Sequence, residues 1–145
     1  MKPVLSSAEM SAWLGFVTAQ GKVFRRVEDG LKLRSGLSHP EYEVLVRLAD
    51  TPDRRARIQE LAAASLLSRS GTSRAVDRLV KAGHLSREGA EEDGRGAYAV
   101  LTDSGLAHLL SAREGHLALV REVFSNRFSA AELSQLAEFL RRLRG

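Results

Sequence analysis

The 145-residue chain contains no cysteine, and this absence excludes several kinds of chemistry at once. Disulfide bonds, thiol nucleophiles, thiolate metal sites and cysteine redox sensing all need a side chain that is missing here. Three prolines and twelve glycines are too few for a fibrous or low-complexity protein. The remaining composition, with 43% apolar and 28% charged residues, predicts a single globular domain over residues 1–145.

Long apolar segments are missing as well. No run of 18 apolar residues occurs, and residues 1–6 lack the apolar core of a secretory signal. The chain has no hydrolase, P-loop or dinucleotide-binding motif, and its histidines lack the spacing of metal ligands. The histidines are His39, His84, His108 and His116. We therefore expect structural or exposed histidines in a cytoplasmic protein with no membrane segment, no catalytic site, no cofactor and no metal.

The basic residues are concentrated in one stretch. The whole chain has 22 Lys and Arg against 18 Asp and Glu, a formal net charge of +4. Residues 65–87 contain five basic residues and one acidic residue, Asp77, so this stretch holds the entire excess. The five basic residues are Arg69, Arg74, Arg78, Lys81 and Arg87. Such a concentration indicates either a solvated helix face or a surface that contacts phosphates.

Three Ser-x-x-Glu sequences, beginning at Ser6, Ser38 and Ser129, are typical of the first turn of a helix. In this capping box the serine hydroxyl accepts from the backbone N–H three residues on, and the glutamate reaches back. With the apolar periodicity, they predict helices over residues 6–34, 40–49, 57–66, 69–82, 102 to about 124, and 130–144. Extended segments at residues 85–87 and 97–101 predict a β-hairpin between the fourth and fifth helices.

The predicted fold is mainly α with a small β-hairpin, in the order α-α-α-α-β-β-α-α. This order is that of a winged helix-turn-helix, with residues 57–66 and 69–82 as the helix pair and residues 85–101 as the wing. A helical wheel of the second helix separates a polar face from an apolar one. The polar face holds Ser70, Ser73, Arg74 and Asp77, and the apolar face holds Thr72, Ala75, Val76 and Leu79. Small polar and arginine side chains favour DNA contact over a merely solvated face.

Several blocks of the sequence are similar to the MarR (multiple antibiotic resistance regulator) family, and the resemblance covers nearly the whole chain. The blocks are GLS at 36–38, EYEVL at 41–45, IQELA at 58–62, SRSGTSRAVDRL at 68–79, KAG at 81–83, and DGRG at 93–96 leading to VLTDSG at 100–105. The resemblance implies a homodimer. Residues 1–36 and 103–145 would be its dimerisation helices, and residues 37–102 its winged helix-turn-helix lobe.

The resemblance also implies a partner, double-stranded DNA with a pseudo-palindromic operator. Ser70, Ser73 and Arg74 would contact bases and phosphates, Arg69 and Arg78 mainly phosphates, and Arg95 the minor groove. Asp93 would orient an arginine through a charge-assisted hydrogen bond. The full predicted DNA-binding set is Ser68, Arg69, Ser70, Ser73, Arg74, Arg78, Arg87, Asp93 and Arg95.

A small-molecule effector is the further expectation from the family. Its site would lie between the dimerisation helices and the DNA-binding lobe, and an arginine there could hold an anionic, for instance phenolic, compound. The candidate lining residues are Trp13, Phe16, His39, Tyr42 and Arg47, with Trp13 equally suited to anchor an interface. The expected function is a repressor released by this effector. The alternatives are a constitutive regulator without a ligand and a winged-helix module that binds other proteins.

Overall fold

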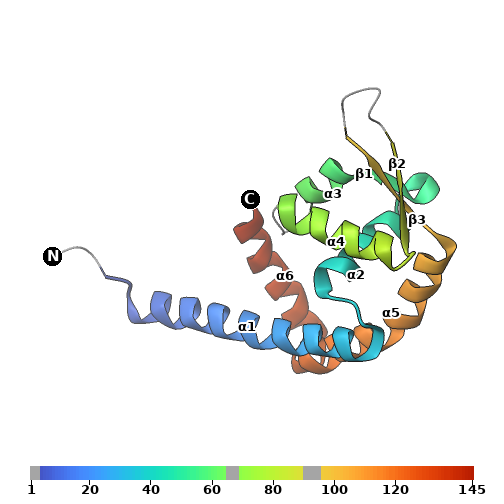
Figure 1. Cartoon of the computed structure of the whole chain (residues 1–145). Helices are drawn as coiled ribbons and strands as arrows, with labels where there is room; N and C mark the ends of the chain where they lie inside the picture. The colour runs from blue at the N-terminus through green and yellow to red at the C-terminus, as the bar shows by residue number, and fades with distance from the viewer. Residues whose placement is uncertain (1–3, 65–68, 90–95) are drawn as a thin grey trace. The chain divides into compact units, whose positions relative to one another are not determined.

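The computed structural model describes residues 4–64, 69–89 and 96–145 (Figure 1). The chain forms two compact units. The central unit is Leu31–Glu114, and the terminal unit combines Met1–Gly30 with Gly115–Gly145. These boundaries lie outside the predicted lobe of residues 37–102, because the ends of two long helices pack with the central unit. Among the described residues, no helix is long and apolar enough to cross a membrane.

The central unit carries the predicted helix pair and a three-stranded sheet. Its elements are α2 (His39–Ala49), the 3-10 turn η1 (Pro52–Arg54), β1 (Arg55–Arg57), α3 (Ile58–Ala64), α4 (Arg69–Lys81), β2 (Leu85–Glu88) and β3 (Tyr98–Leu101). The sheet is antiparallel, in the order β1-β3-β2. The prediction of a mainly α winged helix-turn-helix is confirmed. The predicted two-stranded hairpin was incomplete, because the sheet has a third strand, β1. Arg57, predicted in a helix, pairs with Tyr98 instead because β1 adds to the free edge of β3.

The sheet has one buried and one polar face. Ala56 and Ala99 are paired across β1 and β3, and both are buried. On the other face, the guanidinium carbons of Arg55 and Arg57 lie 3.9 and 4.4 Å from the ring centroid of Tyr98. Cation–π contacts of this kind stabilise arginines that the strand places side by side. The sheet thus shields one edge of the core while remaining polar outside.

Helices α2 and α4 supply the centre of the core. The largest fully buried side chains are Leu45, Leu48, Thr72, Val76 and Leu79. All five lie on these two helices, which contact each other directly. The apolar face predicted for α4 is therefore the face that packs inward. Its polar face is left on the surface of the central unit.

Thr72 is a polar exception within this core, and it leads to a stability prediction. Its side chain is 0% exposed, and its Oγ1 has no hydrogen-bond partner among the described residues. A buried hydroxyl without a partner costs free energy, whereas a methyl group of the same size does not. We expect Thr72→Val to raise the free energy of unfolding by about 1 kcal/mol, measured by urea denaturation. An unchanged or lower value would mean that the hydroxyl is satisfied in solution.

The terminal unit is built from long helices. These are α1 (Ser7–Ser35), α5 (Asp103–Val123) and α6 (Ala130–Arg144), with a 3-10 turn η3 (Ser125–Arg127) before α6; α1 and α5 each continue into the central unit. All three predicted capping boxes form, at Ser6, Ser38 and Ser129. At the last of these, the backbone N–H of Ser129 and then its hydroxyl lower the pKa of Glu132 below its usual range.

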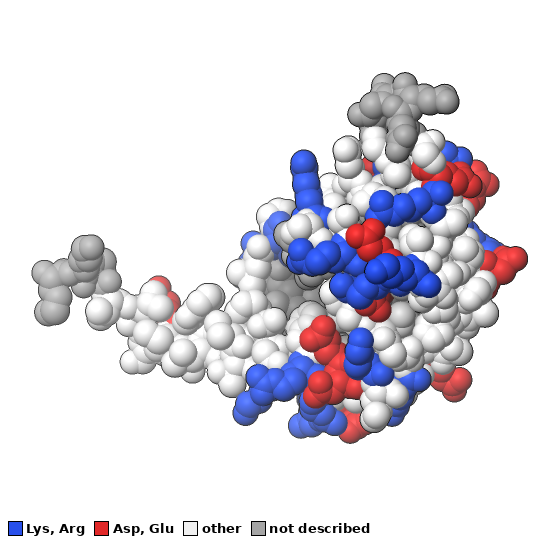
Figure 2. Space-filling view, in the orientation of Figure 1, with Lys and Arg blue, Asp and Glu red and all other residues white. Residues whose placement is uncertain are grey.

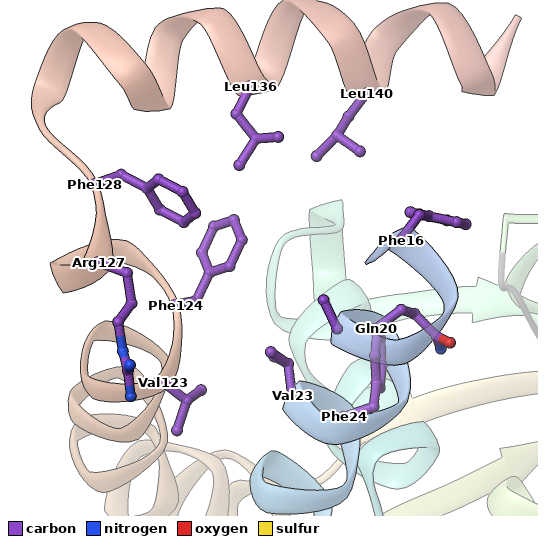
Figure 3. A pocket seen from close by; sticks show the side chains of 11 residues that line it. Phe16, Gln20, Val23, Phe24, Val123, Phe124, Arg127, Phe128, Leu136 and Leu140 are labelled. Atoms are coloured by element: carbon purple, nitrogen blue, oxygen red, sulfur yellow. The ribbon is translucent and has the colours of Figure 1, made fainter. Parts of the chain in front are cut away.

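An apolar groove lies within the terminal unit (Figure 3). It has a volume of about 550 Å³ and is lined mainly by aromatic and aliphatic side chains. They include Phe16, Phe24, Phe124, Phe128, Leu136 and Leu140. Figure 3 shows both leucines pointing from α6 toward the phenylalanines of the α5–α6 connection. Residues 10–21 of α1 contain no charged side chain, and the stretch of α1 after its first turn is correspondingly white in Figure 2.

Candidate nucleic-acid interface

Helix α4 presents the serine and arginine face that the sequence predicts. Arg69, Ser70 and Arg74 are exposed and Ser73 is half-buried, while the opposite face is buried. The helix stops at Gly83, which adopts a φ of 80°, a left-handed conformation that favours glycine. This conformation confirms the predicted stop of α4.

Two arginines of this face are unpaired within the described part of the chain. Neither Arg69 nor Arg74 makes an ion pair there, although both are exposed. Figure 2 shows Lys and Arg side chains gathered over the place that α4 occupies in Figure 1. Exposed guanidinium groups without a carboxylate partner keep their full charge for an anionic ligand. They are the strongest candidates for contact with nucleic acid.

Two other predicted DNA contacts are already engaged with carboxylates. Nε of Arg78 donates to Oε1 of Glu41 at 2.6 Å. Arg87, on β2, donates from a terminal nitrogen to Oδ1 of Asp77 on α4. This second pair ties the base of the wing to the exposed face of α4. Arg78 and Arg87 therefore each hold an ion pair within the protein, in addition to any contact that they make with DNA.

The two acidic partners were missed by the sequence analysis as functional residues. Asp77 was placed on the polar face of α4, and Glu41 was assigned only to a capping box. An acidic residue in a strongly basic stretch is a signal for an internal ion pair, but the sequence does not show which arginine it meets. The predicted residues Ser68, Asp93 and Arg95 lie outside the described residues.

Two histidines connect the end of α4 to the helices α5 and α1. The rings of His84 and His108 are stacked, with centroids 4.5 Å apart and planes 12° from parallel. Nε2 of His108 lies 2.9 Å from the backbone oxygen of Ser35, so this nitrogen must carry a hydrogen. Nδ1 of His84 lies 3.5 Å from the hydroxyl of Ser104. These histidines are structural, as the sequence predicts.

The stack predicts a pH dependence of stability. Burial, and then the nearby His108, lower the pKa of His84, although Glu41 acts in the opposite direction. The folded protein therefore binds this proton less readily than the unfolded chain. The resulting stability is present above the unfolded pKa of about 6.5 and is lost as the pH falls through the lower folded value. We expect His84→Asn to reduce the loss of unfolding free energy on acidification, measured by urea denaturation across this range. If the free energy of unfolding depends on pH equally in the wild-type protein and in His84→Asn, His84 is not the source of the pH dependence.

The five predicted effector residues are divided between the two units. Trp13 and Phe16 belong to the terminal unit, and His39, Tyr42 and Arg47 belong to the central unit. The rings of Trp13 and Phe16 lie 6.3 Å apart on α1. Tyr42 is buried, which raises the pKa of its phenol, and Arg47 pairs with Glu43 at 2.8 Å. Their role in binding an effector stays a prediction.

The comparisons with known proteins agree with this geometry. A sequence profile described as MarR family matches residues 35–96. Sco3205 of Streptomyces coelicolor, a MarR family transcriptional regulator crystallised with DNA, is 33% identical with a TM-score of 0.93. The likeness covers 99% of this chain and 90% of Sco3205. The chain belongs to the MarR family. AbsC, a MarR family regulator from the same organism, is 30% identical with a TM-score of 0.91 over 99% of this chain and 96% of AbsC.

A curated relative shares a shorter region with this MarR family member. The HTH-type transcriptional repressor YetL of Bacillus subtilis is 32% identical over 91 residues. This region is 63% of the present chain but only 54% of YetL, so it spans about half of that repressor. The family assignment confirms the resemblance found in the sequence and places the chain among transcriptional regulators.

Proposed function

We propose that this MarR family protein is a homodimeric repressor that binds double-stranded DNA through α4. The observation that carries the proposal is the exposed face of α4, where Arg69 and Arg74 flank two serines and pair with no described carboxylate. Serine hydroxyls can donate to or accept from base edges, and arginine can bind guanine through two hydrogen bonds. The complex of Sco3205 with DNA and the repressor YetL support this function.

The proposed partner in the dimer is a second copy of the chain, covering the groove of the terminal unit. Phe16 is 44% exposed beside this groove, and the surrounding segment of α1 has no charge. Removing an apolar surface of this kind from water would stabilise the dimer. A two-fold dimer presents two copies of α4. It would read a pseudo-palindromic operator with half-sites about one helical turn apart.

The proposed release of the repressor uses a small anionic or phenolic effector. Arg47 and Tyr42 are the polar candidates, with His39, Trp13 and Phe16 as further contacts. An effector can shift the protein only through a difference in affinity for its DNA-binding and free forms. A constitutive regulator would show the same operator affinity with every compound tested.

Selection of bound sequences from random duplex DNA tests the function. We expect the protein to enrich an inverted repeat and to lose affinity steeply as the salt concentration rises, because arginines release counterions from phosphates. The alternative, a winged-helix module that binds proteins, predicts no enriched sequence and a shallow dependence on salt.

A further inference from the structure

Glu41 is a buried carboxylate that makes two bonds of different kinds. Its Oε2 accepts from the backbone N–H of Ser38 at 3.3 Å, within the capping box of α2. Its Oε1 accepts from Nε of Arg78 at 2.6 Å, although the two residues are 37 positions apart. The capping box explains why a glutamate lies in the first turn of α2, but it does not require an arginine of α4. The second bond therefore needs a separate explanation.

Arg78 lies at the margin of the exposed face of α4. A step of about 100° per residue places it roughly 40° from Arg74, on the side nearer the core. Its side chain is 52% exposed, whereas that of Glu41 is 8% exposed, so the guanidinium bridges a buried carboxylate and the surface. The guanidinium of Arg78 makes no other hydrogen bond to a described residue. Of its five N–H groups, the four on the terminal nitrogens remain for a ligand.

We propose that Glu41 is a positioning residue for DNA recognition, holding Nε of Arg78 so that its terminal nitrogens meet a phosphate of the correctly seated operator. The inference rests on the proposed function and adds a role for a side chain that does not touch DNA. An arginine fixed in advance loses less conformational entropy when it binds than one that is free to change rotamer. Glu41 thereby stabilises the bound geometry before the DNA arrives.

The same carboxylate has a second consequence, because it balances the charge of Arg78. Attraction to random DNA depends on unbalanced positive charge and on counterion release. The paired arginine contributes little to that attraction, yet it can still donate to a phosphate at one fixed position. Glu41 therefore increases the preference for operator over random DNA, in contrast to Arg69 and Arg74, which have no described carboxylate partner.

The test uses the full chain and two probes, a duplex selected by the wild-type protein and a random duplex of equal length. Glu41→Gln keeps the capping box, since glutamine serves at this position. We expect it to lower affinity for the selected duplex by roughly tenfold, because a charged hydrogen bond is replaced by a weaker one. Its affinity for the random duplex should be unchanged or higher, with a steeper salt dependence, because the charge of Arg78 is no longer balanced.

Variants of Arg78 separate positioning from a general effect on folding. Arg78→Lys keeps the charge but lacks the Nε–H group, so it should show a similar loss on the selected duplex. The double variant Glu41→Gln/Arg78→Ala should bind no worse than Arg78→Ala, because Glu41 acts through Arg78. Thermal unfolding of each variant shows whether the fold is retained. If Glu41→Gln does not fold, the affinities of Arg78→Lys for the selected and the random duplex decide whether Arg78 must be held by Glu41.

Several results would overturn the inference. The first is wild-type affinity of Glu41→Gln or Arg78→Lys for the selected duplex. The second is an equal loss of affinity for the selected and the random duplex. The third is a double variant Glu41→Gln/Arg78→Ala whose loss of affinity is the product of the losses of the two single variants. The proposed function survives these results if Arg74→Ala still loses its preference for the selected duplex. A wild-type protein that selects no duplex overturns the proposed function and the inference together.

Discussion

Replacement of Arg74 by alanine is expected to weaken binding to the selected operator by about 1–3 kcal/mol, the usual loss when a base-reading arginine is removed. Arg74 is exposed at the middle of the polar face of α4 and has no carboxylate partner among the described residues. Its truncation should therefore remove a ligand contact without breaking an internal one. Titration of labelled duplexes, one selected and one random, measures the difference.

A matched control distinguishes a local contact from a change in net charge. Arg144→Ala removes the same charge at the end of α6, far along the chain from α4. This control should reduce affinity for both duplexes only slightly. A loss by Arg74→Ala that is equal on selected and random DNA would reassign Arg74 to a phosphate contact.

A glutamate in place of Phe16 is expected to dissociate the dimer. Phe16 lines the groove of the terminal unit within a segment of α1 that has no charge. Burial of a carboxylate without a partner costs several kcal/mol, so the dimer dissociation constant should rise by about a hundredfold or more. Sedimentation equilibrium measures this constant, and operator binding should weaken in parallel because one copy reaches only one half-site.

Leu33→Glu is the control for this change. Leu33 is 87% exposed on the same helix, but it lies outside the uncharged segment and between two basic residues. This variant should remain a dimer with an unchanged dissociation constant. If Phe16→Glu stays dimeric as well, the groove is not the surface that meets the second copy.

Local signals in the sequence were sufficient for much of the fold. The capping boxes at Ser38 and Ser129 form as predicted, because such bonds join residues only three apart. Gly83 ends α4 for an equally local reason, its left-handed backbone. Strand β1 was missed because three residues are too few to show an alternating pattern. Its partner, β3, is also about forty residues further along the chain.

The candidate site was predictable as a surface but not as a network of pairs. Periodicity places Arg74 on the polar face of α4 whatever its neighbours are. In contrast, the pairing of Arg78 with Glu41 depends on how α2 packs against α4, which no local pattern specifies. The pairing of Arg87 with Asp77 likewise depends on where β2 passes α4. Sequence reasoning therefore found the basic residues and missed the acidic residues that hold two of them.

The absence of cysteine allows the most direct measurement of where α4 lies on DNA. A single cysteine introduced as Ser70→Cys can carry a DNA-cleaving iron chelate, with Ser134→Cys on α6 as the control. If α4 contacts the operator, the Ser70→Cys conjugate should cut both half-sites about one helical turn apart, and the control should not. Equal cleavage by the two conjugates, or no cleavage by a Ser70→Cys conjugate that still binds the operator, would contradict the placement of α4 on DNA.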